Sequence, residues 1–380
     1  MNKAYKKSTG LIPNFKPFIP EGSIDKVIKT LRTSWIGGDG PEVLEFEHEI
    51  AKIIKNKNVL AVNSGTSALQ LALRLANVKG GEVITTPMTC FATNAPIVTE
   101  GAIPVWADIN PETGNIDPED ITRKITKKTK AIMVVHWGGS PAEIDLINKT
   151  ASNYKLKVIE DAAQALGSEY AGKPIGAHSD FVAFSFQAIK IINTVDGGLL
   201  AARKSTDAKR GRILRWYGIS REERKWDKRF TFWEYPISEI GYKMQMTDVS
   251  ASIGLGQLPY LKNLLEYRRK IAKLYEEALA ESKTLMAQKT LPKAKSNYWL
   301  FTIICNSENT KLKLWKALAK IGVRAEEAHK RNDTYPVFAK YNKEKLPGVT
   351  TFNDNHLIIP VGHWVSEQKG KEIAEIFSHF

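Results

Sequence analysis

A single lysine, Lys190, interrupts an otherwise apolar stretch that follows the strand-like run Phe181 to Phe186. Lysine is rarely buried without a reason, and a desolvated lysine has a lowered pKa that makes its amine a usable nucleophile for Schiff-base chemistry. A snorkelling or ion-paired lysine is the alternative, and this segment taken alone favours it. Ser185, within the strand-like run, adds a hydroxyl group nearby in the sequence.

A second candidate is the pair of acids that ends the apolar run Val158-Ile159, namely Glu160 and Asp161. In open α/β sheets, ligands lie outside the carboxyl ends of the strands. A carboxylate there can keep a pyridine nitrogen protonated, which is what makes pyridoxal phosphate (PLP) an electron sink. A helix cap formed by Asp161 explains this segment equally well.

A third candidate is the turn after the strand-like run Val59 to Val62, which reads Asn63-Ser64-Gly65-Thr66-Ser67 and leads into a helix. The free N–H groups and the positive dipole end of a helix N-terminus suit a phosphate group. An ordinary Ser/Thr helix cap is the simpler interpretation of the turn by itself.

Together, the three segments place a phosphate turn, a ring-nitrogen acid and a Schiff-base lysine in the chain order of PLP aminotransferases. The sequence resembles the DegT/DnrJ/EryC1/StrS family of sugar aminotransferases over nearly its whole length. The resemblance rests on Thr33-Ser34-Trp35-Ile36, Gly40-Pro41, Phe46-Glu47, Asn63 to Leu69, Thr86 to Thr93, Glu160 to Gln164, Ser185 to Gly198, and Gly241 to Asp248.

The resemblance implies a type I PLP fold of the α/β class and an enzyme that aminates a nucleotide-linked keto-sugar with L-glutamate as donor. It also implies a role for each matching residue. The phosphate would be bound by the backbone at Gly65 and Thr66 and by the Ser185 hydroxyl; Phe91 would stack on the pyridine, Asp161 would contact the ring nitrogen, Gln164 would lie near the ring hydroxyl, and Lys190 would be both Schiff-base residue and general base.

Three positions depart from the family pattern. Gln164 stands where a histidine is common, and Val195-Asp196 replaces Gly-Glu before the paired glycines. Lys243 stands where an asparagine from the neighbouring subunit often meets the phosphate. We therefore expect a homodimer with composite sites, in which Lys243 reaches the cofactor of the other subunit as a point charge. An ordinary surface lysine is the alternative.

Residues for the sugar nucleotide are expected in the polar segment 328–336, which contains His329 and Arg331. A pyrophosphate needs cationic and donor groups, and the family uses a comparable loop. Trp35 is a further candidate, packing against the sugar or base. A solvated polar turn ending at Pro336 is nearly as good an interpretation of this segment.

These candidates need a framework of strands and helices to bring them together. Strand-like runs separated by helix-length segments predict crossover units and a mostly parallel or mixed sheet covered on both faces. From Thr247 a helical pattern continues to about Ala280. We expect it to bridge a large PLP-binding domain (residues 1–250) to a small α+β domain (residues 251–380).

Composition limits the other classes of function. The net charge is +14, from 55 Lys and Arg against 41 Asp and Glu, but the excess is spread out and predicts no nucleic-acid partner. Cys90 and Cys305 lack the spacing of metal ligands, so no metal is expected. No membrane span or secretory signal is apparent, and we expect a cytoplasmic protein. The alternatives are a PLP-dependent sugar dehydratase, in which histidine replaces the lysine, and a non-catalytic regulator of the same fold.

Overall fold

The computed structural model describes residues 10–229 and 232–380, and its central feature is a seven-stranded sheet. The strand order is β1-β9-β8-β5-β4-β2-β3. Only β9 runs antiparallel to its neighbours. The strands of this sheet are β1 (Val59–Val62), β2 (Glu82–Thr85), β3 (Ile103–Trp106), β4 (Thr129–Val135), β5 (Lys157–Asp161), β8 (Phe181–Ser185) and β9 (Gly198–Ala202).

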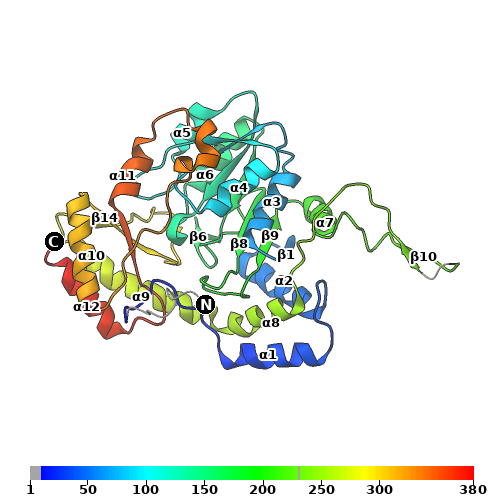
Figure 1. Ribbon diagram of the computed structural model, residues 1–380, viewed down its shortest axis with the longest axis horizontal. Coiled ribbons are helices and arrows are strands. Elements are labelled where there is room, and N and C mark those ends of the chain that lie inside the picture. Colours follow the sequence, from blue (N-terminus) through cyan, green and yellow to red (C-terminus); the bar gives the residue numbers. More distant parts are fainter. Residues whose placement is uncertain (1–9, 230–231) are drawn as a thin grey trace.

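Helices cover both faces of this sheet (Figure 1). In β4, Ile132 and Val134 pack into one apolar cluster while Ala131 and Met133 pack into another on the opposite face. This is the pattern of a parallel sheet buried on both sides, so the predicted α/β fold is confirmed. The helices are α1 (Glu21–Arg32), α2 (Pro41–Ile54), α3 (Gly65–Leu75), α4 (Phe91–Thr99), α5 (Pro118–Lys124), α6 (Ile144–Asn153) and α7 (Ser205–Leu214), with a 3-10 turn at Trp137–Gly139.

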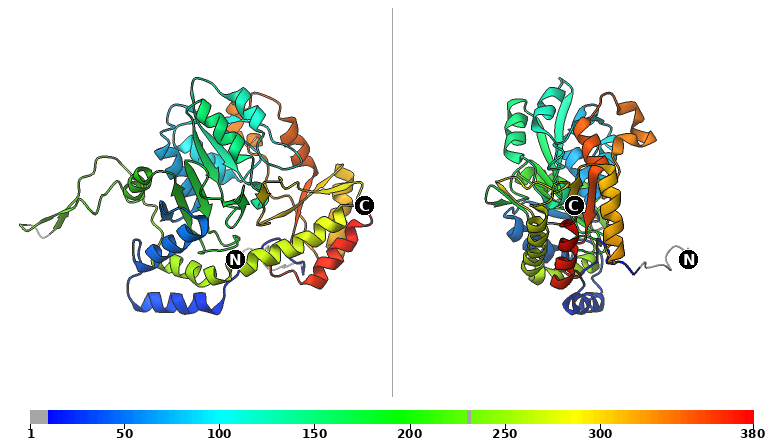
Figure 2. Two further views of the ribbon diagram at one scale, coloured as in Figure 1. Left: turned by 180° about the vertical axis from the view of Figure 1, so that it is seen from behind. Right: turned by 90° about the vertical axis from the view of Figure 1, so that its left-hand side faces the viewer.

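The helical pattern beginning at Thr247 predicts one long helix, but the structure contains two. The segment is divided into α8 (Asp248–Gln257), a 3-10 turn (Leu258–Tyr260) and α9 (Leu261–Leu279). The break falls at Pro259, because proline lacks the N–H group that a continuous helix requires. Figure 2 shows α9 leading from the region of the large sheet into the C-terminal part of the chain. The proposed domain boundary at residue 250 falls within α8.

The C-terminal part contains a three-stranded antiparallel sheet in the order β12-β14-β15, packed against α9, α10 and α12. Its elements are β12 (Leu285–Ala287), β14 (Phe301–Cys305), α10 (Glu308–Lys320), two 3-10 turns (Asn332–Thr334 and Pro336–Tyr341), α11 (Pro347–Asn355), β15 (His356–Ile359) and α12 (Glu367–Phe377). A third small sheet joins β13 (Ala294–Lys295) to β6 (Glu169–Tyr170) and β7 (Lys173–Pro174).

Two features stand out from the body of the molecule. A hairpin of β10 (Lys225–Asp227) and β11 (Phe232–Glu234) projects from the large domain as an arm (Figures 1 and 2). Helix α1 lies along the edge of the molecule beside α8. None of the helices in the described ranges is long and apolar enough to cross a lipid bilayer.

Candidate active site

The predicted phosphate turn forms a closely packed joint between β1, α3 and β8. Ser64 caps α3, and its hydroxyl accepts a hydrogen bond of 3.0 Å from the Ser67 N–H. A Cβ atom added to Gly65 would lie 2.7 Å from Cβ of Ser185, and one added to Gly198 would lie 2.3 Å from the Ser64 carbonyl oxygen. The two glycines therefore let the helix N-terminus approach the Ser185 side chain, which puts amide and hydroxyl donors side by side.

Asp161 ends β5 and is 5% exposed. Its carboxylate accepts a hydrogen bond of 2.7 Å from the Thr93 hydroxyl and one of 3.0 Å from the Ala163 N–H. The Thr93 hydroxyl is also 2.8 Å from that of Thr89. Thr93 lies in the first turns of α4, so this helix holds the carboxylate in one orientation. Thr93 lies in a segment on which the family resemblance rests, but that resemblance assigned it no role.

Lys190 lies in the loop between β8 and β9, where its side chain is only partly exposed. Burial lowers the pKa of its amine to about 8, against smaller opposing contributions from Asp161 and Cys90. A lysine with such a pKa has a substantial fraction of neutral amine near neutral pH, as a nucleophile requires. Lys190 and Asp161 are thus close enough for their charges to interact.

Gln164 meets His329, although the two residues are 165 positions apart in the sequence. The Gln164 side-chain oxygen accepts a hydrogen bond of 2.7 Å from the Gly138 N–H, and its amide nitrogen lies 3.4 Å from Nε2 of His329. Burial, with a smaller contribution from Lys190, lowers the pKa of His329 to about 3. His329 is therefore a neutral hydrogen-bonding group at physiological pH.

The loop that carries His329 is fastened to the large domain by Asn332. Its amide accepts a hydrogen bond of 3.0 Å from Asn94 and donates one of 2.8 Å to the Thr89 carbonyl. Its own N–H donates to the carbonyl of Pro87 at 2.7 Å. Asn332 is 1% exposed, so these buried amides join the loop firmly to the segment that precedes Phe91. Sequence reasoning missed this contact, because neither asparagine belongs to a recognisable motif.

Phe91 begins α4 and is 44% exposed. Its ring meets that of Tyr335 edge-on at 5.6 Å between centroids and that of Phe338 at 5.5 Å. Such aromatic contacts restrict the orientation of a ring. The expected stacking of Phe91 on a pyridine remains a prediction.

The remaining predicted residues have other contacts within the described chain. Arg331 forms a bidentate ion pair with the buried Asp333, at 2.8 and 2.7 Å, and also donates to the Thr350 hydroxyl at 2.8 Å. Trp35 packs over Gly40, and the exposed Lys243 lies 5.8 Å from the Trp216 ring centre. Their roles toward substrate or a neighbouring cofactor stay predictions.

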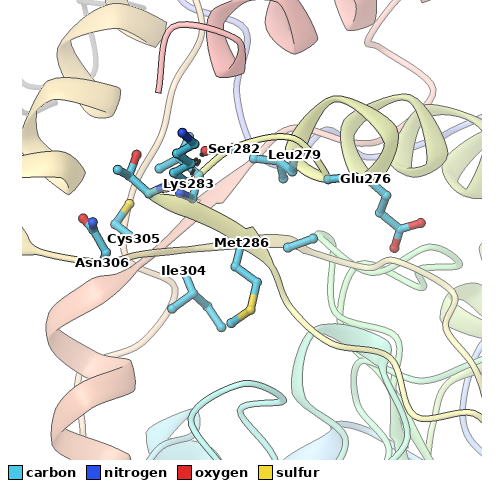
Figure 3. Close-up of a pocket in the computed structure, with 12 residues that line it drawn as sticks. Glu276, Leu279, Ser282, Lys283, Met286, Ile304, Cys305 and Asn306 are labelled. Carbon is cyan, nitrogen blue, oxygen red and sulfur yellow. Dashed lines mark hydrogen bonds between the residues drawn. The ribbon is translucent and has the colours of Figure 1, made fainter.

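The pocket in Figure 3 lies elsewhere, between the end of α9 and strands β12 and β14. Its lining includes Glu276, Met286 and Asn306 and contains none of the predicted site residues. The chemistry is instead expected at the carboxyl end of β5 and in the loops beside it. There the chain offers phosphate donors, a fixed carboxylate and a reactive amine, which together fit an aldehyde-bearing phosphorylated pyridine.

Sequence comparison places this arrangement among known proteins. A model of the DegT/DnrJ/EryC1/StrS aminotransferase family matches residues 18–378. An uncharacterized protein of Methanocaldococcus jannaschii, MJ1066, is 38% identical over 364 residues, which are 92% of each chain. The spore coat polysaccharide biosynthesis protein SpsC of Bacillus subtilis is 38% identical over 279 residues, covering 73% of this chain and 71% of SpsC.

Solved structures show the same architecture. The sugar aminotransferase CalS13 of Micromonospora echinospora has a TM-score of 0.90 and 31% identity, covering 97% of this chain and 100% of CalS13. The PLP form of Spr1654 of Streptococcus pneumoniae, which is named as a candidate sugar aminotransferase, has a TM-score of 0.88 and 28% identity. The match covers 97% of this chain and 98% of Spr1654. DesI, solved with its TDP-sugar product, has a TM-score of 0.84 and 26% identity over 97% and 92%.

Proposed function

Because this chain belongs to the DegT/DnrJ/EryC1/StrS aminotransferase family and is a PLP-dependent sugar aminotransferase, we propose that it transfers an amino group from L-glutamate to a nucleotide-linked keto-sugar. The family predicted from the sequence is confirmed, and so is the cofactor. The observation that most supports the proposed chemistry is that Lys190, whose pKa is lowered by burial to about 8, lies within electrostatic range of the fixed carboxylate of Asp161.

The proposed roles follow from what each group can donate or accept. Bound PLP supplies an electron sink for the bonds at the amino-bearing carbon. Gly65, Thr66 and Ser185 would hold its phosphate, because their amide and hydroxyl donors lie at the N-terminus of α3. Asp161 would keep the ring nitrogen protonated. Lys190 would hold the cofactor between turnovers and move a proton as general base and acid.

The substrate assignment rests on the relatives together with the groups beside the site. DesI was solved with a TDP-sugar, and SpsC is named for polysaccharide biosynthesis. The neutral His329 lies next to Gln164. It can donate a hydrogen bond to a sugar hydroxyl or accept one from it, without adding charge to the site. Lys190 also argues against the dehydratase alternative, in which histidine replaces this lysine.

A homodimer is part of the proposal, and α1 supports it. The fully buried side chains of α1 are polar: the Ser23 hydroxyl donates to the Ile253 carbonyl at 2.9 Å, and Thr30 is also buried, while Val27 between them is partly buried. The apolar side chains of Ile24, Ile28 and Leu31 instead point outward, each more than 40% exposed. An apolar stripe of this kind is usually covered by another protein surface, and we propose a second copy of the chain.

Two measurements test the proposed reaction. The holoenzyme is first mixed with L-glutamate alone, and the visible band of bound PLP should disappear as the amino group is transferred. The aminated enzyme is then offered a panel of nucleotide-linked keto-sugars, and mass spectrometry should find one of them converted to an amino sugar, with the band restored. Loss of the band with another donor but not with glutamate would refute the donor. Loss of water from the sugar, without gain of nitrogen, would favour the dehydratase.

A further inference from the structure

An aromatic ring lies directly beside the amine of the predicted Schiff-base lysine. Nζ of Lys190 is 3.8 Å from the centre of the Trp299 ring. This distance is well inside the range of about 6 Å within which a cation is attracted to the face of an aromatic ring, and tryptophan is the strongest partner. Trp299 comes from the segment before β14, more than 100 residues after Lys190, and no motif in the sequence marked it.

The Trp299 ring is fixed from several directions. Its Nε1 donates a hydrogen bond of 3.0 Å to the carbonyl of Ile189, the residue next to Lys190. The backbone N–H of Trp299 donates a hydrogen bond of 2.8 Å to Oδ1 of Asn297. The Phe15 ring also contacts the indole, at 5.1 Å between centroids. The indole and the lysine loop are therefore held as one unit.

The residue before Trp299 has an unusual backbone conformation. Tyr298 has a φ of +49°, in the left-handed region that non-glycine residues rarely adopt. Such a conformation persists only where the surroundings enforce it, and it is frequent at functional sites. Here the buried Asn297 amide donates to the carbonyls of Gln164 and Leu166, both at 2.9 Å. The segment is thus joined to the loop that follows Asp161.

We propose that Trp299 is a positioning residue on which the Lys190 amine rests whenever it is not bonded to the cofactor, and that the indole face stabilises the protonated form of that amine. The proposal rests on the assignment of Lys190 as the PLP lysine. A general base must hold a proton in one interval and release it in the next. A ring that attracts the ammonium group without bonding to it meets both needs, because it accepts no proton itself.

The other groups that face Lys190 do not take over the role proposed for the Trp299 ring. Asp161 favours the ammonium form by charge, but its carboxylate is assigned to the cofactor ring and accepts bonds from Thr93 and Ala163. Cys90 acts in the same direction and more weakly, while His329 is neutral at physiological pH. Trp299 is the aromatic face that the described residues place over Nζ.

The test measures the protonation of Lys190 without turnover. Full-length protein is stripped of PLP, and the rate at which added PLP is captured is followed as a function of pH. Capture joins the neutral lysine amine to the PLP aldehyde as a C=N bond and releases water. The midpoint of the rate profile therefore reports the Lys190 amine, and Lys190→Ala should abolish capture.

Tryptophan analogues carrying one, two or four fluorine atoms, placed at position 299 alone, weaken the ring's attraction for a cation while nearly preserving its shape. We expect the midpoint to move to lower pH with each step, by about 0.4 to 1.5 pH units in total. Trp299→Phe should give a smaller shift than Trp299→Leu. The same analogues at the exposed Trp315 of α10 are the matched control and should leave the midpoint unchanged.

A constant midpoint across the fluorinated series would overturn the role of Trp299, even if capture became slower at every pH, since a purely structural role changes rates without moving the profile. If Lys190→Ala captured PLP with an unchanged profile, the assignment of Lys190 itself would fall, and the inference with it. The two failures are therefore distinguishable.

Discussion

Replacing Gly65 by alanine probes the phosphate turn directly, because the structure shows how little space it has. The added Cβ would lie 2.7 Å from Cβ of Ser185 and 3.1 Å from its hydroxyl oxygen. Ordinary contact between carbon atoms needs about 3.5 Å, so Ser185 and the start of α3 must separate by about 0.8 Å. Overpacking of this kind costs about 1–3 kcal/mol, partly offset by up to about 1 kcal/mol from the better helix propensity of alanine.

The larger effect should be on cofactor binding. A shift of this size takes one donor out of hydrogen-bonding range of the phosphate, and a bond to a charged group is worth about 1.5–3 kcal/mol. We therefore expect PLP to bind Gly65→Ala about 10- to 150-fold more weakly. The assay is titration of PLP-stripped protein with PLP, followed by the visible band of the bound cofactor.

Gly370→Ala is the matched control, since the added Cβ in α12 has 3.3 Å or more to its nearest neighbour, a flexible Ile271 methyl group. It should bind PLP like the parent protein and be no less stable. If Gly65→Ala bound PLP as tightly as Gly370→Ala does, the reasoning that close packing of Gly65 on Ser185 builds the phosphate site would be refuted.

Further predictions concern the acid, the lysine and the substrate loop. Asp161→Asn should retain PLP through its phosphate yet lose transamination by about 100- to 1,000-fold; near-normal turnover would exclude the ring-nitrogen role. Burial depresses the pKa of Lys190 from 10.5 to about 8, so the PLP-free protein loses stability as the pH falls from 10.5 to about 8. Lys190→Met should therefore have a higher melting temperature than the parent protein at pH 7, and no such advantage at a pH above 10.5. His329 stays neutral in the fold, with its pKa lowered from 6.5 to about 3, so stability is lost as pH falls from 6.5 towards 3; His329→Gln should flatten this part of the melting profile, and an unchanged profile would contradict its burial as a neutral group. Arg331→Ala leaves the buried Asp333 carboxylate unpaired and should lower the unfolding free energy by about 3–5 kcal/mol; a raised KM for the nucleotide sugar with unchanged melting would instead support the predicted substrate contact.

Much of the site was predictable because its parts are local in the sequence. The turn at Gly65, the acid at the end of β5 and the lysine after β8 each follow an apolar strand, and strand boundaries can be recognised from composition. Parallel strands place their carboxyl ends at one edge of a sheet, so the convergence of Asp161 and Lys190 followed from chain order. The strand-like runs Val59 to Val62 and Phe181 to Phe186 match β1 and β8 of the structure within one residue.

Periodicity was a poorer guide wherever two interpretations share one pattern. The apolar spacing that runs past Pro259 is the same for one helix as for two, and only the structure shows the division into α8 and α9. Ile24, Ile28 and Leu31 of α1 have regular helical spacing, yet their side chains are exposed. A hydrophobic pattern shows that a surface will be covered but not by which chain, because the pattern carries no information about the partner.

The sequence by itself determined the family and the order of the main strands, and it named the residues that are expected to carry the chemistry. Only the tertiary structure decided which distant side chains surround them: Trp299 against Lys190, His329 beside Gln164, and Asn332 clamped to Asn94. The physical reason is that a turn or a strand follows from the preferences of neighbouring residues. A contact between segments more than 100 residues apart depends instead on how whole elements pack, and no local pattern in the chain records that packing.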